Sequence, residues 1–171
     1  MTRNFKKTFV IISVGLPFLL YCVYYYAHVF KNAPYKFTEF KSFKFEYGAG
    51  DSLINKYNSA TGKYQYVDSH DSLVKMNLFL TSKELKTLHD TAAMLGFWDW
   101  PTDETGDSTI RHNGQRSPRY VMEFNYQRKS KKIKFDESFD GDERLKEANR
   151  HMVKEILHVL AVAESRKKDS I

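Results

Sequence analysis

A run of oxygen-bearing residues near the C-terminus has the spacing of a calcium-binding loop. The segment DESFDG (residues 136–141) is followed by Glu147. An EF-hand loop likewise has oxygen ligands at alternate positions, a glycine at the sharp turn and a glutamate at position 12. This pattern predicts Asp136, Ser138, Asp140 and Glu147 as calcium ligands. The alternative is an acidic loop whose carboxylates satisfy free amides at the start of a helix.

A second row of possible metal ligands lies on the predicted C-terminal helix. Glu147, His151, Glu155 and His158 recur at helical spacing and share one helix face. Histidine and carboxylate side chains in such a row are compatible with a metal site. The alternative is a solvent-exposed face that is stabilised by pairs of side chains one helical turn apart.

A basic stretch next to an aromatic residue is compatible with contacts to phosphate groups. The basic residues follow Tyr126 closely and are Arg128, Lys129, Lys131, Lys132 and Lys134. Cations can neutralise phosphates while an aromatic ring stacks on a base, but lysines also protect an exposed edge strand from aggregation. Because the N-terminal segment described below predicts an exported domain, we exclude nucleic acid and favour a lysine-rich exposed face or edge strand. An anionic polymer of the cell envelope is the weaker alternative.

The sequence lacks the patterns of nucleophilic catalysis. The chain has no G-x-S-x-G motif, no glycine-rich phosphate-binding loop and one cysteine, Cys22. We therefore assign no catalytic residue and no cofactor apart from the possible calcium ion.

A protein-binding surface is indicated by Trp98 and Trp100, which are followed by a loop with Arg111 and Arg116. The alternative for both tryptophans is packing in the core.

The N-terminal segment has the character of a membrane anchor. No charged residue lies between Lys7 and Lys31, and a helix over residues 8–30 is long enough to cross hydrocarbon. We therefore expect a cytoplasmic N-terminus (1–7), a transmembrane signal-anchor (8–30) and a single-pass membrane protein whose C-terminal domain is periplasmic or extracellular. A cleaved secretory signal is the alternative, although small residues suited to cleavage are scarce.

Residue periodicity predicts the elements of the remaining chain. The expected strands lie near residues 43–47, 64–66, 74–80, 120–126 and 133–135, and the expected helices lie near 82–95 and 143–164. The order βββαββα favours an α+β fold in which an antiparallel sheet of about five strands has both helices on one face, after the transmembrane helix. Residues 31–36 are a predicted linker, 37–165 the predicted domain and 166–171 a predicted basic tail.

Composition supports a folded domain. Hydrophobic residues make up 42% of the chain and charged residues 28%, which excludes general disorder. A single cysteine excludes an internal disulfide and a cysteine-rich zinc site. Part of the formal net charge of +6 comes from Arg3, Lys6 and Lys7, so the predicted domain has an ordinary surface charge.

The predicted domain also has a recognisable layout. Its marks are the helix opening LTSKEL (80–85), the segment LGFWDWP (95–101), the paired strands over 120–135 and the leucine-rich last helix. From Leu73 to about Leu160 this layout resembles that of small bacterial envelope domains that include the emfourin-like protease inhibitors. The resemblance implies a non-enzymatic module that binds an extracellular metalloprotease.

These patterns together predict a membrane-anchored, extracytoplasmic binding module without catalysis. We expect residues 8–30 to contact the membrane and the tryptophan and arginine surface to contact a protein, such as a secreted enzyme that the module inhibits. A calcium-binding envelope domain that uses residues 136–147 is the alternative, and a small enzyme is a third.

Overall fold

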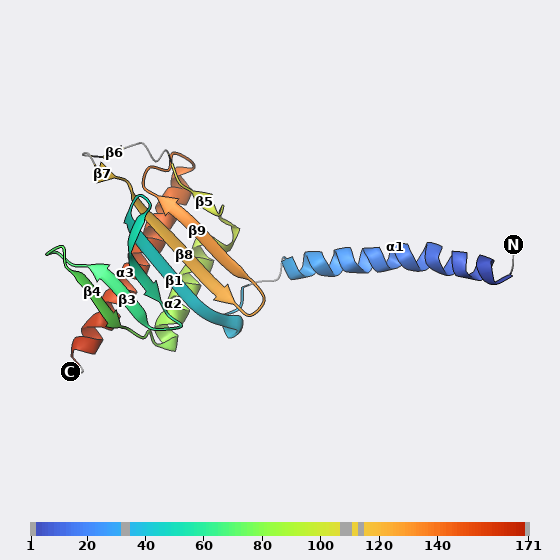
Figure 1. Cartoon of the computed structure of the whole chain (residues 1–171), viewed down its shortest axis with the longest axis horizontal. Coiled ribbons are helices and arrows are strands. Elements are labelled where there is room, and N and C mark those ends of the chain that lie inside the picture. Colours follow the sequence, from blue (N-terminus) through green and yellow to red (C-terminus); the bar gives the residue numbers. More distant parts are fainter. Residues whose placement is uncertain (1–2, 32–34, 107–110, 113–114, 170–171) are drawn as a thin grey trace. The chain divides into compact units, whose positions relative to one another are not determined.

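The computed structural model describes residues 3–31, 35–106, 111–112 and 115–169. The chain divides into two compact units, Met1–Tyr35 and Lys36–Ile171. The first unit contains the helix α1 (Arg3–Lys31). The second contains the sheets and the two remaining α-helices (Figure 1).

The structure corrects the expectation for the N-terminal segment. Pro17 lies inside α1, and no helix in the described ranges is both long enough and apolar enough to cross a membrane. The predictions of a transmembrane signal-anchor over 8–30 and of a single-pass membrane protein were therefore wrong. They relied on the length of the segment and the absence of charge, whereas Tyr21 and the tyrosines at 24–26 carry amphipathic rings that suit the membrane–water interface.

The second unit is built on a seven-stranded mixed sheet with the order β4-β3-β2-β1-β8-β9-β5. Its strands are β1 (Phe40–Ala49), β2 (Ser52–Asn58), β3 (Lys63–Val67), β4 (Leu73–Asn77), β5 (Asp103–Glu104), β8 (Pro118–Tyr126) and β9 (Ser130–Asp136). Neighbouring strands are antiparallel except β5, which is parallel to β9. A separate ribbon pairs β6 (Arg111–His112) with β7 (Gln115–Arg116).

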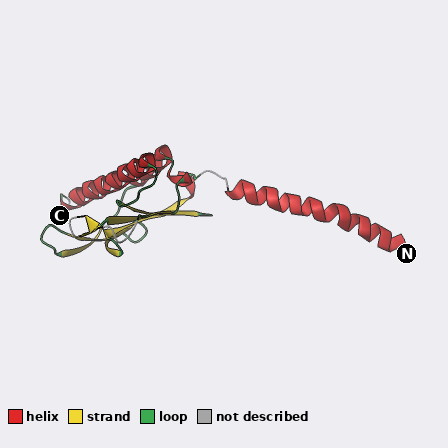
Figure 2. Ribbon diagram, turned by 90° about the horizontal axis from the view of Figure 1, so that it is seen from above, coloured by secondary structure: helices red, strands yellow, loops and turns green. Residues whose placement is uncertain are grey.

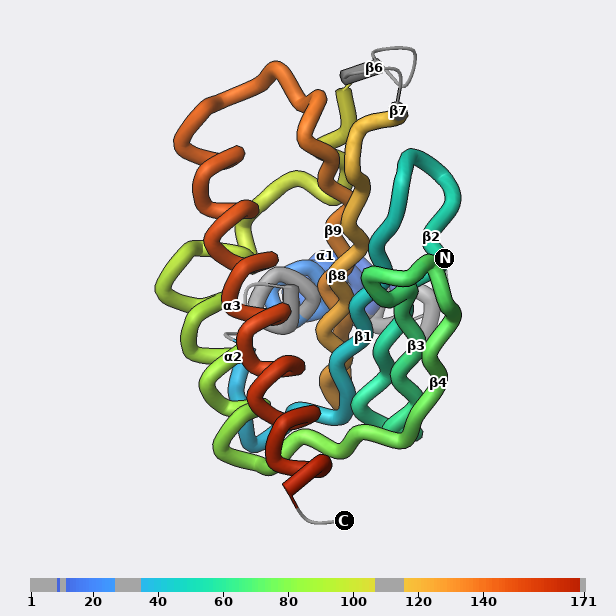
Figure 3. Tube along the Cα trace, turned by 90° about the vertical axis from the view of Figure 1, so that its left-hand side faces the viewer, coloured from blue at the N-terminus to red at the C-terminus, as the bar shows by residue number. Residues whose placement is uncertain are grey.

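Two α-helices, α2 (Ser82–Leu95) and α3 (Glu143–Lys168), lie side by side on one face of this sheet (Figures 2 and 3). Short 3-10 helices span Phe37–Glu39 and Phe97–Asp99. Thr81 and Glu84 form a reciprocal capping box at the start of α2, which satisfies free amides of its first turn. The last turn of α3 includes residues 166–168, which were predicted to belong to a basic tail.

Aromatic side chains fill the space between the sheet and the helices. Phe43 and Phe45 of β1 and Phe124 of β8 are fully buried, because alternate residues of a strand point to the same face. Met152 and Ile156 of α3 are also fully buried. This packing leaves the opposite face of the sheet without a helix from this unit (Figure 2).

The predicted antiparallel sheet of about five strands and the order βββαββα were wrong. The sequence SLINKYN of β2 was missed because asparagine and, to a lesser degree, lysine are depleted in strands. The segment after Trp100, which was interpreted as a loop, contains the parallel edge strand β5 and strand β6. Two-residue strands have no periodicity that a sequence can reveal, and they depend on pairing with a distant partner.

Candidate functional site

The face of the sheet away from the helices has two rows of polar side chains across β1 to β4. One row runs through Lys44, Asn58, Lys63 and Asn77, which are successive cross-strand partners. The next row runs through Glu46, Lys56, Gln65 and Lys75. Directly opposite side chains in a sheet lie close together, so the strand register brings four lysines, three amides and one carboxylate onto one surface.

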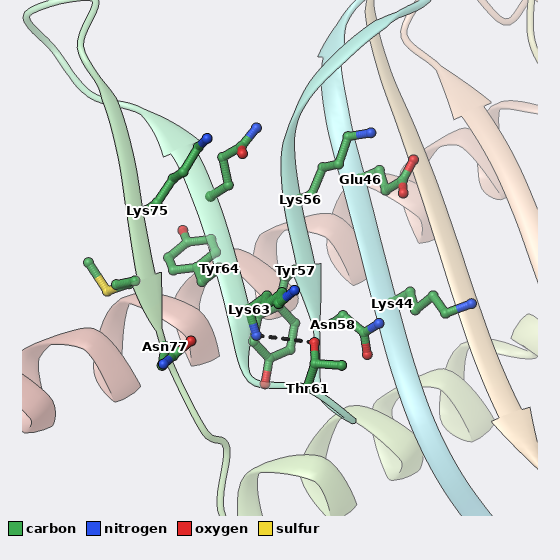
Figure 4. A pocket seen from close by; sticks show the side chains of 12 residues that line it. Lys44, Glu46, Lys56, Tyr57, Asn58, Thr61, Lys63, Tyr64, Lys75 and Asn77 are labelled. Atoms are coloured by element: carbon green, nitrogen blue, oxygen red, sulfur yellow. Dashed lines mark hydrogen bonds between the residues drawn. The ribbon is translucent and has the colours of Figure 1, made fainter.

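This surface is hollowed. A cavity of about 760 Å³ is lined by both rows, together with Tyr57, Thr61, Tyr64 and Met76. In the close view, the side chains of Lys56 and Lys75 lie on the near side of the sheet, while α2 and α3 lie behind it (Figure 4). We call this surface, made of the two polar rows, the lysine face.

Three of the four lysines on the lysine face have no ion-pair partner among the described residues. Lys44 forms an ion pair with Glu123 of β8 at 3.1 Å. Within the part of the chain that the structure describes, Lys56, Lys63 and Lys75 form no ion pair. Three ammonium groups therefore surround the cavity without a bound carboxylate, and the site favours an anionic ligand.

Side-chain amides hold the strands of the lysine face in register. Asn55 donates to the carbonyl of Tyr47 at 3.1 Å and accepts from the amide of Val67 at 2.8 Å, so it joins β1, β2 and β3 where the β1–β2 register shifts. The amide of Gln65 donates to the Ile54 carbonyl at 2.7 Å. Polar residues in β2, which obscured the strand in the sequence, therefore have a structural role.

A glycine permits the irregular pairing beside the lysine face. A Cβ atom at Gly48 would lie 1.9 Å from the carbonyl oxygen of Ser52, a distance that no real Cβ contact reaches. The close approach of β1 and β2 at this bulge therefore requires glycine.

The tyrosines that line the cavity are uncharged at neutral pH. Burial raises the pKa of Tyr57 to about 12, and burial also raises the pKa of Tyr64. The other ionisable groups of the lining are lysines and Glu46. The lining includes no histidine or cysteine, and its ammonium and amide groups can donate hydrogen bonds to a ligand.

The predicted partner-binding residues lie in different environments. Trp100 is 8% exposed, packs on Phe97 and donates its indole N–H to the Leu95 carbonyl at 3.2 Å. Trp98 is half-buried and packs on Phe97 and Phe124. Trp100 is therefore a core residue, and the exposed part of this aromatic cluster belongs to Trp98.

The two predicted arginines belong to the β6–β7 ribbon. Arg111 pairs with Arg116 through the backbone, but the Arg111 side chain lies outside the described part of the structure. Arg116 is exposed, and its side chain approaches Gly50 at the β1–β2 turn. A role for these residues in partner binding stays a prediction.

The predicted calcium ligands differ in their exposure to solvent. The Asp136 carboxylate is buried and accepts from Arg119 at 3.0 Å and from the Ser138 hydroxyl at 2.6 Å. Burial opposes ionisation, but these hydrogen bonds and the one from the Gly106 amide hold the pKa of Asp136 below its ordinary value. Asp140 and Glu147 are exposed.

The second row of predicted metal ligands lies on α3. Among the residues that the structure describes, no group of three or more histidine, cysteine, aspartate or glutamate side chains is arranged to hold a metal ion. Calcium binding through the loop and metal binding through the row from Glu147 to His158 both stay predictions.

Sequence reasoning missed the lysine face as a site. The signal was present as polar residues that alternate with aromatic residues within a strand, as around Lys44 in FKF and after Lys63 in KYQY. Their convergence depends on the pairing of four strands, and β2 had not been recognised.

Comparisons with known proteins leave the family open. No protein-family model, curated protein or solved structure matches the chain. The resemblance to the emfourin-like inhibitors therefore stays a prediction.

Proposed function

We propose that this protein is a non-catalytic binding module whose lysine face binds an acidic protein partner. The observation that carries the proposal is the cavity on the helix-free side of the sheet, lined by four lysines and one carboxylate. Lys56, Lys63 and Lys75 supply positive charge that a partner's carboxylates can neutralise. Burying these ammonium groups without such partners would be costly, so charge complementarity selects an acidic surface.

The chemistry of the lysine face favours protein over nucleic acid. Proteins that bind single-stranded nucleic acid stack bases on exposed aromatic rings. The rings of Tyr57 and Tyr64 are instead buried. The cavity lining also contains lysine but no arginine, whereas arginine is favoured where planar, bidentate recognition of phosphate is needed. Amide side chains between the lysines can bond backbone and carboxylate groups of a protein.

Inhibition of an enzyme, as expected from the sequence, is one form that such binding can take. An inhibitor needs a surface that occupies or covers the active site of its target, and it needs no catalytic group of its own. The lysine face meets that requirement for a target with an acidic surface.

Charge-reversal variants test the proposal. The double variant Lys56→Glu/Lys63→Glu should weaken binding of a blocked peptide of alternating glutamate and valine by roughly tenfold or more, because each reversal replaces an attraction with a repulsion. The matched control is Lys83→Glu/Lys154→Glu, which makes the same change of net charge at exposed positions of α2 and α3.

The two variants separate local from general electrostatics. The control should change the dissociation constant by about twofold at most at physiological ionic strength, because charges beyond the Debye length are screened. Equal weakening by both double variants would contradict the proposal, since net charge alone would then explain the binding.

A further inference from the structure

The outer edge of β4 lies beside the lysine face and has no strand partner among the residues that the structure describes. β4 is the terminal strand of the sheet, and it is antiparallel to β3 with Lys75 opposite Gln65. The backbone amide of Leu78 donates to the carbonyl of Gly62 at 2.6 Å, and the carbonyl of Ser72 accepts from the amide of Asp68 at 3.0 Å. The backbone N–H and C=O groups of the even-numbered residues of β4 therefore point toward β3. Antiparallel pairing alternates, so the backbone groups of Leu73 and Lys75 point outward.

One end of this edge is already used by the chain itself. Lys167 of α3 donates to the carbonyl of Asn77 at 2.7 Å, and Arg166 donates to the carbonyl of Phe79 at 3.2 Å. The bond from Lys167 confirms that the backbone carbonyl of Asn77 also points outward. They leave the outward backbone groups of Leu73 and Lys75 as the accessible part of the edge.

We infer that the acidic partner binds as an extended segment that adds a strand to the outer edge of β4, an inference that rests on the proposed function. Backbone hydrogen bonds to Leu73 and Lys75 would supply affinity, as in other cases of strand addition. Residues of the added strand that face Lys75 would carry carboxylates. Those on the other face would be apolar, because Val74 and Met76 there are half-buried.

A second copy of the chain fits this edge poorly. β4 spans Leu73–Asn77 and Lys75 is its central residue. An antiparallel pair of two β4 strands about that centre would place Lys75 directly opposite the Lys75 of the other copy. Like charges directly opposite each other destabilise a sheet, whereas a glutamate at that position forms a favourable pair.

Backbone methylation of a peptide tests strand addition without changing the protein. The probe is a blocked eight-residue peptide of alternating glutamate and valine, titrated into the full chain. In an antiparallel addition, glutamates opposite Leu73 and Lys75 donate their N–H groups to β4, so N-methylation of the glutamates should weaken binding by about tenfold or more. N-methylation of the valines is the matched control and should change affinity by about twofold at most, because those N–H groups point away from β4.

A substitution at the edge provides a second readout. Leu73→Pro removes an outward N–H at the first residue of the strand, a position where proline is tolerated. Leu73→Pro should weaken binding of the unmodified peptide by about tenfold, whereas Leu73→Ala should weaken that binding by about twofold. Circular dichroism checks that both variants are folded. If Leu73→Pro is unfolded, the N-methylated peptides alone decide whether a strand is added to β4.

The outcomes distinguish this inference from the proposed function. Equal binding of the two N-methylated peptides, with binding still lost in Lys56→Glu/Lys63→Glu, would overturn strand addition and leave the lysine face as the site. A sulfated oligosaccharide or an oligonucleotide that binds as tightly as the peptide would also overturn it, because neither can extend the sheet. Absence of binding by every acidic peptide would overturn the proposed function as well.

Discussion

A buried carboxyl group should make the stability of this fold depend on pH in the neutral range. Glu104 of β5 is fully buried, as is Asn149 of α3, whose side-chain amide donates to it. Burial raises the pKa of Glu104 from 4.5 to about 7, although the bond from Asn149 and the charge of Lys131 oppose the rise and Asp103 adds to it. One oxygen of Glu104 and the side-chain oxygen of Asn149 have no hydrogen-bond partner among the described residues.

The size and sign of the effect follow from this shift. Below pH 4.5 the carboxyl group is protonated in the folded and the unfolded chain, so it carries no penalty. Between pH 4.5 and 7 the unfolded chain releases the proton and the folded chain retains it, so stability falls as pH rises. Above pH 7 the accumulated cost is roughly 3 kcal/mol.

The variant Glu104→Gln measures this cost. A glutamine at this position keeps the shape and an acceptor for Asn149 but cannot ionise. We expect the free energy of unfolding in urea to change by less than about 1 kcal/mol at pH 5 and to rise by about 2–3 kcal/mol at pH 8. Glu147→Gln, at an exposed position of α3, is the control and should reproduce the pH profile of the native chain.

The test rests on the difference between the stability effects of Glu104→Gln at pH 5 and at pH 8. An equal effect of Glu104→Gln at pH 5 and pH 8 would refute it, because a purely structural role of the carboxyl group does not change with pH. A loss of stability that grows with pH would refute it as well.

Three further perturbations test local features of the fold. Thr81→Ala should lower the free energy of unfolding by about 1 kcal/mol in chemical denaturation, because it removes half of the capping box, and Thr81→Ser should restore most of it. Gly48→Ala should lower the melting temperature sharply, since the added Cβ collides with the Ser52 carbonyl; an unchanged melting temperature would contradict the bulge. Burial lowers the pKa of His89, so native stability should fall as pH decreases through about 6.5, and His89→Gln should remove that part of the acid dependence.

Local signals in the sequence predicted α2 well. The capping box at Thr81 and Glu84 and the left-handed glycine Gly96 at its other end are both present. Each depends on residues that are close in sequence, so each can be identified without knowledge of the fold. The buried alternation of Phe43 and Phe45 was identifiable for the same reason.

The lysine face could not be predicted because it depends on register. Lys44, Lys56, Lys63 and Lys75 come from four strands, and each alone is an ordinary surface lysine. A shift of one residue in any strand would place its lysine on the opposite face. Cross-strand pairing is therefore what creates the site, and the sequence carries no local mark of it.

The environment of the tryptophans was equally hard to predict. Trp98 and Trp100 are two residues apart, but the 3-10 turn between them and the bond from Trp100 to Leu95 determine which of them is buried. The mixed character of the sheet could not be predicted either, because β5 is a strand only through its parallel pairing with the distant strand β9.

The most direct test of the account is amide chemical-shift mapping with the alternating glutamate and valine peptide and isotopically labelled full chain. The account predicts that the largest shifts fall on Lys56, Lys63, Gln65 and Lys75 and decrease as salt is added. Shifts concentrated on α2 and α3, or a lysine face that does not respond at saturating peptide, would contradict the proposal that this surface binds an acidic partner.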